Sequence, residues 1–207
     1  MQSMNTRIEI DVLENNMAQI VLATSNKHKL EEINAIAEKF NISFSKVDDD
    51  FNPIEDGKNF EENAYIKAFE AAKLTNKIAF ADDTGLCVEA LDGRPGIYSA
   101  RYAPTQEEKI SKLLEEMKAV PQEKRNAYFI CTMVAVDSSG KILYKTTGKI
   151  DGFIVNSPSG ANGFGYDPIF YIPKLNKTMA ELTTDEKNTV SHRALALIPM
   201  IEYLRAL

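Results

Sequence analysis

The sequence predicts an α/β protein in which helices flank a mixed, partly antiparallel twisted sheet. In the first half, short apolar runs alternate with helical patterns, as in strand–helix units. In the second half, two long β-rich runs cover residues 127–137 and 142–155, and Ser138-Ser139-Gly140 between them predicts an antiparallel hairpin. The 207 residues, 44% of them hydrophobic, are enough for one sizeable core.

Composition restricts the class of partner. The net charge of −6 and the absence of any Lys/Arg run longer than two residues argue against a nucleic-acid groove, whereas a free nucleotide stays compatible. Both cysteines, Cys87 and Cys131, lie in apolar surroundings and are expected to be buried, reduced thiols. No stretch approaches the roughly 18 apolar residues of a membrane span. We therefore expect a soluble, cytoplasmic protein that contacts neither membrane nor nucleic acid.

The N-terminal residues 1–16 are polar and precede a second methionine, Met17. We interpret them as a loosely attached extension and residues 17–207 as one domain. The apolar–polar alternation over residues 8–12 leaves open a short edge strand.

A strand, a polar turn and a helix are expected over residues 18–40. Residues 18–23 form the strand, Thr24-Ser25-Asn26 the turn, and a helical pattern starts at Lys29. The free amides of such a helix start, together with the Lys29 charge, predict an anion site. The alternative is ordinary capping by Ser25 or Asn26 with Lys29 in solvent. Neither GxGxxG nor GxxxxGK[ST] occurs, so the common nucleotide fingerprints do not apply.

Residues 42–47 read as a second strand that leads into a solvated acidic loop, residues 48–50. A helix follows over residues 60–74, with an alanine face suited to close packing. Asn63, Lys67 and Glu70 form a polar stripe on this helix. Such stripes usually face solvent, so the sequence alone gives Lys67 little functional weight.

The apolar run of residues 77–81 predicts a buried strand that ends at Asp82 and Asp83. Carboxylates at the end of such a strand lie where open α/β sheets bind their ligands. They suit Mg²⁺ binding or proton abstraction from water. The alternative is a turn in which Asp83 caps its own backbone. Turn formers at residues 91–96 and an amphipathic helix at residues 106–117 follow.

The Gly-rich segment of residues 159–168 allows close approach to a ligand, and Phe164 within it could stack on a flat ring or pack into the core. Thr183 opens a capping box, and the final helix begins near Ser191. His192 at that start could be a packed histidine or could bind a carbonyl oxygen. Pro199 predicts a kink or break near Ile198, because an interior proline costs about 3 kcal/mol.

Six segments in order resemble those of the inosine triphosphate pyrophosphatase family, also called XTP/dITP diphosphatases. They are residues 23–29 (ATSNKHK), 60–64 (FEENA), 81–86 (ADDTGL), 92–102 (DGRPGIYSARY), 163–170 (GFGYDPIF) and 191–193 (SHR). The resemblance covers the chain from about residue 18 to its end. Ser25 departs from the pattern, since glycine is common there, and the 16-residue extension has no family counterpart.

The resemblance implies Mg²⁺-dependent hydrolysis of ITP, dITP or XTP to the monophosphate and pyrophosphate by a homodimer. Each subunit would have two lobes with the active-site cleft between them. Asp83 would be the general base and a metal ligand, assisted at the metal by Asp82 and Glu55, and Lys67 would contact phosphate. The phosphates would be held by Thr24, Ser25, Asn26, Lys27, His28 and Lys29. The remaining substrate contacts would come from Thr84, Phe164, Gly165, Tyr166, Asp167, Lys187, His192 and Arg193.

Two rival interpretations stay open. A related pyrophosphatase for pyrimidine or modified nucleotides would share the phosphate site but should lack Phe164 and the His192-Arg193 pair. A nucleotide-binding module without turnover would gain little from carboxylates that face phosphate without a metal.

Overall fold

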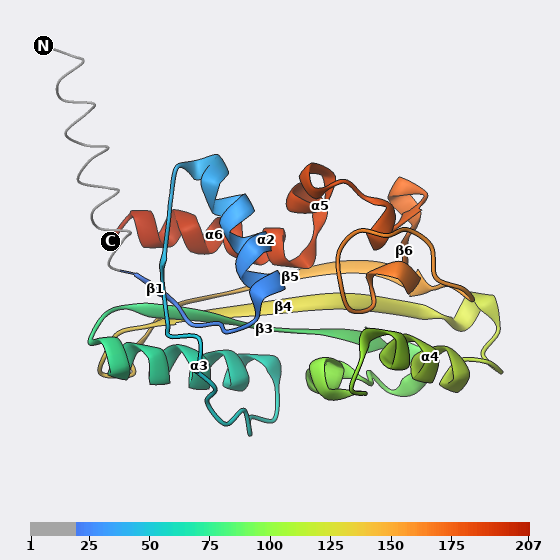
Figure 1. Cartoon of the computed structure of the whole chain (residues 1–207), viewed down its shortest axis with the longest axis horizontal. Helices are drawn as coiled ribbons and strands as arrows, with labels where there is room; N and C mark the ends of the chain where they lie inside the picture. The colour runs from blue at the N-terminus through green and yellow to red at the C-terminus, as the bar shows by residue number, and fades with distance from the viewer. Residues whose placement is uncertain (1–19) are drawn as a thin grey trace, which may run out of the picture. The chain divides into compact units, whose positions relative to one another are not determined.

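The computed structural model describes residues 20–207 (Figure 1). The expected extension, residues 1–16, and the first part of the expected strand at 18–23 lie outside these residues. Within them, seven strands form one sheet in the order β2-β1-β3-β4-β5-β6-β7. The strands are β1 (Val21–Leu22), β2 (Ser45–Lys46), β3 (Ala79–Val88), β4 (Asn126–Val136), β5 (Ile142–Ile154), β6 (Phe170–Ile172) and β7 (Lys177–Thr178).

The sheet is mixed, as the sequence predicts. β1 pairs in parallel with both β2 and β3, with Val21 opposite Ser45 on one side and Ala79 on the other. β6 runs antiparallel to β5 and β7. β4 and β5 are neighbours joined by the tight turn over residues 137–141, where the Gly140 amide bonds to the Asp137 carbonyl oxygen at 3.0 Å. The predicted hairpin is therefore confirmed.

The chain divides into two compact units, and β3, β4 and β5 contribute residues to both. The first unit comprises the chain up to Asp83 together with Thr132–Thr147 and Ala196–Leu207, and the second comprises Thr84–Cys131 and Gly148–Leu195. The cleft expected between two lobes stays a prediction.

In the first unit, α2 (Lys27–Ala37) and α3 (Phe60–Thr75) lie on opposite faces of the sheet (Figure 1). The predicted alanine face of α3 is fully buried against apolar side chains of β1, β3 and β4. Small side chains let a helix approach a sheet closely, which brings the rest of the α3 surface near β3. The Asn59 side chain caps the start of α3, and Asn76 in the left-handed conformation ends it.

The second unit contains α4 (Gln106–Glu116) and α5 (Thr184–Val190), and both begin at capping boxes, of Thr105 and Thr183. Its core gathers apolar residues of β3, α4, β4, β5 and β6, with the rings of Phe129 and Phe170 4.7 Å apart. Cys87 and Cys131 are both buried, as expected. Short 3-10 turns occupy Glu38–Phe40, Glu89–Leu91, Gly96–Arg101, Gln122–Lys124, Asp167–Ile169, Pro173–Leu175 and Met179–Glu181.

Two expectations about element ends are wrong. The strand that was expected to stop at Asp82 and Asp83 continues to Val88, because Leu86 and Val88 are buried and each carboxylate has a lysine partner. Because β3 runs through Asp83, the alternative in which Asp83 caps its own backbone in a turn is also excluded. In the last helix, α6 (His192–Arg205), the expected break at Pro199 is absent, and the alternative, a kink, stays a prediction. Burial of Leu197, Met200 and neighbouring apolar residues stabilises it on both sides of the proline.

No helix in residues 20–207 is both long enough and apolar enough to span a membrane.

Candidate active site

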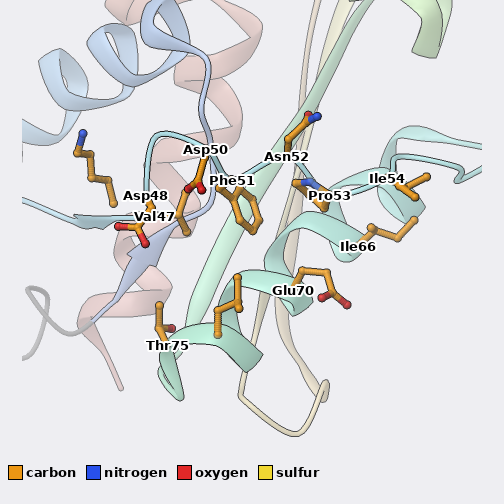
Figure 2. A pocket seen from close by; sticks show the side chains of 12 residues that line it. Val47, Asp48, Asp50, Phe51, Asn52, Pro53, Ile54, Ile66, Glu70 and Thr75 are labelled. Atoms are coloured by element: carbon orange, nitrogen blue, oxygen red, sulfur yellow. The ribbon is translucent and has the colours of Figure 1, made fainter.

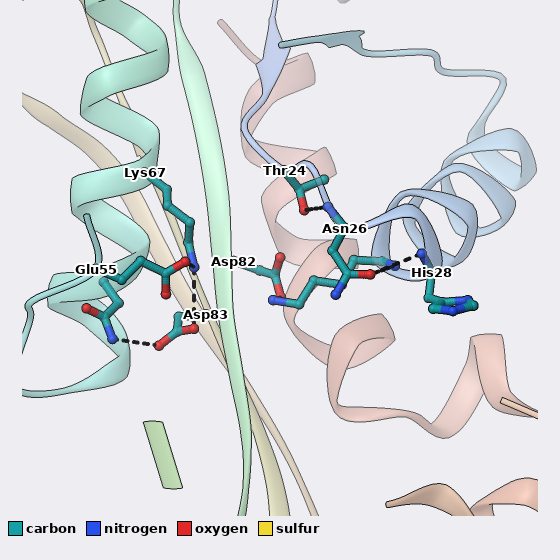
Figure 3. A network of polar contacts seen from close by, with 9 residues as sticks. Thr24, Asn26, His28, Glu55, Lys67, Asp82 and Asp83 are labelled. Atoms are coloured by element: carbon teal, nitrogen blue, oxygen red, sulfur yellow. Dashed lines mark hydrogen bonds and ion pairs between the residues drawn. The ribbon is translucent and has the colours of Figure 1, made fainter. Parts of the chain in front are cut away.

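Asp83 lies at the centre of a buried polar cluster between β3 and α3 (Figure 3). Lys67 Nζ lies 3.4 Å from Asp83 Oδ1 and 3.1 Å from Glu55 Oε1. Asn63 donates its side-chain N–H to Asp83 Oδ2 at 3.2 Å, and the Gly57 amide donates to Asn63 Oδ1 at 2.9 Å. The polar stripe of α3 therefore faces the sheet at Asn63 and Lys67, not solvent, which corrects the usual expectation for such a stripe.

The charges of this cluster perturb one another. Burial raises the pKa of the Asp83 carboxyl, against the opposing effect of the Lys67 and Lys29 ammonium groups. Burial opposes the charge on Lys67, but three nearby carboxylates outweigh it and raise the pKa of this ammonium. Lys67 therefore stays charged, and Asp83 is a stronger base than an exposed aspartate.

Asp82 points to the opposite face of β3, toward α2 (Figure 3). Successive side chains of a strand alternate between faces, so neighbouring carboxylates separate once the strand runs through them. Asp82 Oδ2 lies 2.8 Å from Lys29 Nζ, and the carboxylate is buried. The structure thus places Asp82 with Lys29 and does not bring it together with Glu55 and Asp83.

The six residues expected to contact phosphate lie in the turn after β1 and in the first turn of α2, which begins at Lys27. Asn26 caps α2, accepting from the amides of His28 at 3.1 Å and Lys29 at 3.3 Å, and Thr24 Oγ1 accepts from the Asn26 amide at 3.2 Å. Ser25, Lys27 and His28 are exposed. The capping alternative is confirmed for Asn26, but Lys29 is not in solvent, since only 14% of its side chain is exposed. The anion site at this turn stays a prediction.

The donor set around Lys67 fits a hard cation. Glu55 and Asp83 direct carboxylate oxygens at one position, where the Lys67 ammonium already lies, and such oxygens are the ligands that Mg²⁺ prefers. Within residues 20–207, no group of three or more His, Cys, Asp or Glu side chains is arranged to hold a metal. Further ligands would have to come from water or substrate phosphate, as is usual for Mg²⁺.

The second unit holds the other predicted site residues. Phe164 is half-buried, with Lys187 Nζ 5.2 Å and Arg193 Cζ 5.7 Å from its ring centroid. Lys187 forms a 2.6 Å ion pair with Asp167, and both side chains are buried. A Cβ atom on Gly163 would overlap the Asp167 carboxylate, so glycine is required next to Phe164. Two cations therefore lie over the Phe164 ring. Since the residue is only half-buried, Phe164 is not fully packed into the core.

His192 is the first residue of α6, is buried, and stacks on Phe129 with centroids 4.7 Å apart. Arg193 beside it is also buried. Tyr166 is buried too, and its hydroxyl donates to the Ser99 carbonyl oxygen at 3.1 Å. Thr84 is half-buried in the middle of β3.

Sequence reasoning missed two residues. Asn63 bonds directly to Asp83, and its place on the polar stripe of α3 was the signal that could have identified it. Gln106 bonds to the Gly165 amide at 2.8 Å, and no feature of the sequence indicates this contact.

A cavity of about 820 Å³ opens elsewhere in the first unit (Figure 2). Part of its wall is the loop after β2, including Phe51 and Ile54, and part is the face of α3 around Ile66, Glu70 and Leu74. None of the predicted site residues lines it.

Comparison with known proteins identifies the family of the chain. The model of the Ham1 family matches residues 20–203. A dITP/XTP pyrophosphatase of Geobacter sulfurreducens is 46% identical over 194 residues, which cover 91% of this chain and 97% of that protein. A HAM1 protein structure from Coxiella burnetii aligns with a TM-score of 0.82 at 40% identity, covering 92% of this chain and all of that one. The Staphylococcus aureus Ham1 structure aligns with a TM-score of 0.79 at 39% identity, covering 90% and 98%. This chain therefore belongs to the Ham1 family.

Proposed function

We propose that this protein hydrolyses non-standard purine nucleoside triphosphates (dITP, ITP and XTP) to the nucleoside monophosphate and pyrophosphate. The observation that carries the proposal is the cluster of Asp83, Lys67 and Glu55, in which Asp83 and Lys67 are buried and Glu55 is half-buried. It combines a base of raised pKa with a fixed cation in one place. Relatives named dITP/XTP pyrophosphatase at 42–46% identity over most of the chain support the choice of substrate.

The residues of the first unit would act on the triphosphate. Asp83 would take a proton from a water molecule that attacks the α-phosphorus in line with the departing pyrophosphate. Lys67 stays protonated and would stabilise the negative charge that develops on phosphate oxygens. Asn63 orients the Asp83 carboxylate, and Asp82 holds Lys29 near the turn of Thr24 to His28, whose residues would bind the outer phosphates.

Mg²⁺ would be held by Glu55 and Asp83, with further ligands from water or substrate phosphate. When bound, it would supply Lewis-acid chemistry and neutralise phosphate charge. The assisting role of Asp82 would be indirect, through its bond to Lys29.

The residues of the second unit would recognise the base. Phe164 offers an aromatic face for a purine ring, with Lys187 and Arg193 at its side. Arginine only donates hydrogen bonds, so Arg193 with a donating His192 suits the 6-keto oxygen of hypoxanthine and xanthine and opposes the 6-amino group of adenine. A mispaired buried polar group costs about 1–3 kcal/mol of binding free energy. Several such contacts together would discriminate strongly against adenine nucleotides.

The decisive experiment measures pyrophosphate and orthophosphate released from ITP, XTP, GTP and ATP, with Mg²⁺ and with EDTA. The expected result is pyrophosphate from ITP and XTP, almost none from ATP, and none without metal. Orthophosphate release, or equal rates on every nucleotide, would overturn the proposal. Binding of ITP without turnover would instead favour the nucleotide-binding module.

We further propose a cytoplasmic homodimer, on the basis of the family resemblance. Sedimentation equilibrium of the purified chain would test the assembly, and a mass near 23 kDa, that of one chain, would contradict it.

A further inference from the structure

We infer that Gln106 is a positioning residue for base recognition: from the first turn of α4 it holds the Gly165 amide and thereby fixes the ring of Phe164. This inference rests on the proposed function, since it assigns the role of Phe164 in binding the purine. It adds a determinant that lies 58 residues before that ring in the sequence.

The segment around Phe164 needs an external support. Gly163 and Gly165 flank the aromatic residue, and both adopt the left-handed backbone conformation, with φ of 74° and 64°. Glycine has the widest choice of backbone conformations, so two of them leave the residue between them poorly fixed by its own chain. Hydrogen bonds to the backbone of this segment therefore help to set the orientation of the Phe164 ring, together with Lys187 and Arg193 beside the ring.

Several bonds supply that support, among them one in which the Asp167 amide donates to the Phe164 carbonyl oxygen at 3.3 Å. Asp167 accepts from the Phe164 amide at 3.0 Å within the segment. The Tyr166 hydroxyl reaches the Ser99 carbonyl oxygen at 3.1 Å. Gln106 Oε1 accepts from the Gly165 amide at 2.8 Å. Among the residues that the structure describes, only the Gln106 bond joins the Gly165 amide to a helix of the second unit.

Gln106 is well placed to act as a rigid support. It directly follows Thr105, whose side chain and that of Glu108 satisfy each other's backbone amides in a capping box. Ile110 and Leu113 then anchor α4 in the core of the second unit. The Gln106 side chain is half-buried and extends from this fixed helix start to Gly165, one of the two glycines that flank Phe164.

The substitution Gln106→Ala removes the acceptor, whereas Gln106→Glu keeps an oxygen acceptor at the same reach. Base stacking contributes equally to the bound substrate and to the transition state, so its loss raises KM and leaves kcat almost unchanged. For Gln106→Ala we expect KM for dITP to rise about threefold to tenfold, the range for one neutral hydrogen bond, with kcat within about twofold. Gln106→Glu should stay within about twofold of the wild type in both.

Inhibitors with and without a base separate positioning from a general loss of structure. Inosine monophosphate should inhibit Gln106→Ala more weakly by the same factor as the KM change, whereas tripolyphosphate, which has no base, should inhibit it as it does the wild type. Glu107→Ala, an exposed change in the same helix turn, serves as the control and should alter neither. Melting temperatures of all four proteins show whether the fold is kept.

The possible results separate the two proposals. Three results would overturn the positioning role alone. They are an equal loss of inhibition of Gln106→Ala by both inhibitors, an unchanged KM in Gln106→Ala, and a failure of Gln106→Glu to retain activity. A wild-type chain that does not hydrolyse dITP in the same assay would overturn the proposed function and this inference with it.

Discussion

Asp82 and Asp83 are consecutive residues of β3, yet their carboxylates bind different lysines on opposite faces of the sheet. Asp82 Oδ2 lies 2.8 Å from Lys29 of α2, and Asp83 Oδ1 lies 3.4 Å from Lys67 of α3. The two acids are therefore not a pair that shares one ion, although the sequence suggests one. Each belongs to its own ion pair, and the two substitutions should have different consequences.

Asp83→Asn should abolish turnover and leave the fold intact. Asparagine keeps an oxygen that can accept the Asn63 bond but cannot take a proton, and a positioned base contributes about 100-fold or more. The rate of pyrophosphate release from dITP and the melting temperature of the variant test this. A variant that retains more than about a tenth of the wild-type rate would exclude Asp83 as the base.

Asp82→Asn should mainly affect stability and phosphate binding. The substitution leaves the Lys29 ammonium beside a neutral group, although only 14% of the Lys29 side chain is exposed. Breaking a buried ion pair in this way costs about 3 kcal/mol or more of folding stability. Urea unfolding of Asp82→Asn, Lys29→Met and the double variant gives the coupling between the two residues. The double variant should lose clearly less than the sum of the two single losses, and strict additivity would show that the pair contributes nothing.

Asn63→Asp should move the acidic limb of the pH–rate profile to higher pH. A second carboxylate beside Asp83 disfavours its ionised form and raises its pKa further, so the base is protonated and inactive over a wider acidic range. The profile of kcat/KM from pH 5 to pH 9 measures the shift. Asn59→Asp is the matched control, because Asn59 is exposed and caps α3, where aspartate serves equally well. An identical shift in the control would locate the effect in the general charge of the helix start.

Glu116 should contribute to stability at neutral pH but not in acid. The Tyr102 hydroxyl donates to it at 2.6 Å and Arg94 pairs with it at 2.9 Å, and these contacts lower the pKa of its carboxyl. A carboxyl group whose pKa is lower in the folded than in the unfolded protein stabilises the fold at any pH above its pKa in the unfolded state. This contribution is lost as the pH falls through its pKa in the folded state. Glu116→Gln should therefore cost about 0.5–1 kcal/mol at pH 7 and progressively less below about pH 4. Urea unfolding at pH 7 and pH 3 measures both values, and an equal loss at the two would contradict the assignment.

The elements themselves could be predicted from the sequence because they depend on local features. Alternating apolar runs indicate the strands, the capping box at Thr183 marks α5, and the alanine face of α3 indicates its packing. The candidate site residues were taken from short motifs, and their roles stay predictions. The cap of α2 at Asn26 was within the expected alternatives, since Asn is among the best helix caps.

The errors arose where packing overrides local preference. Two adjacent aspartates usually end a strand, but partner lysines from α2 and α3 let β3 continue through them. A proline usually interrupts a helix, but burial on both sides keeps α6 continuous. A polar stripe usually faces water, but the close approach of α3 turns Asn63 and Lys67 toward Asp83.

The sequence by itself determined the mixed α/β class, the order of the main helices and of the strands as far as β5, and the identity of the charged groups that chemistry would need, whereas β6 and β7 were not predicted. Only the tertiary structure decided which of those groups meet. Side chains alternate across a strand, so the faces of Asp82 and Asp83 depend on whether the strand continues, and that depends on lysines 53 and 16 residues earlier. Contacts between residues this distant in the chain, such as Gln106 with Gly165, leave no trace in local sequence patterns.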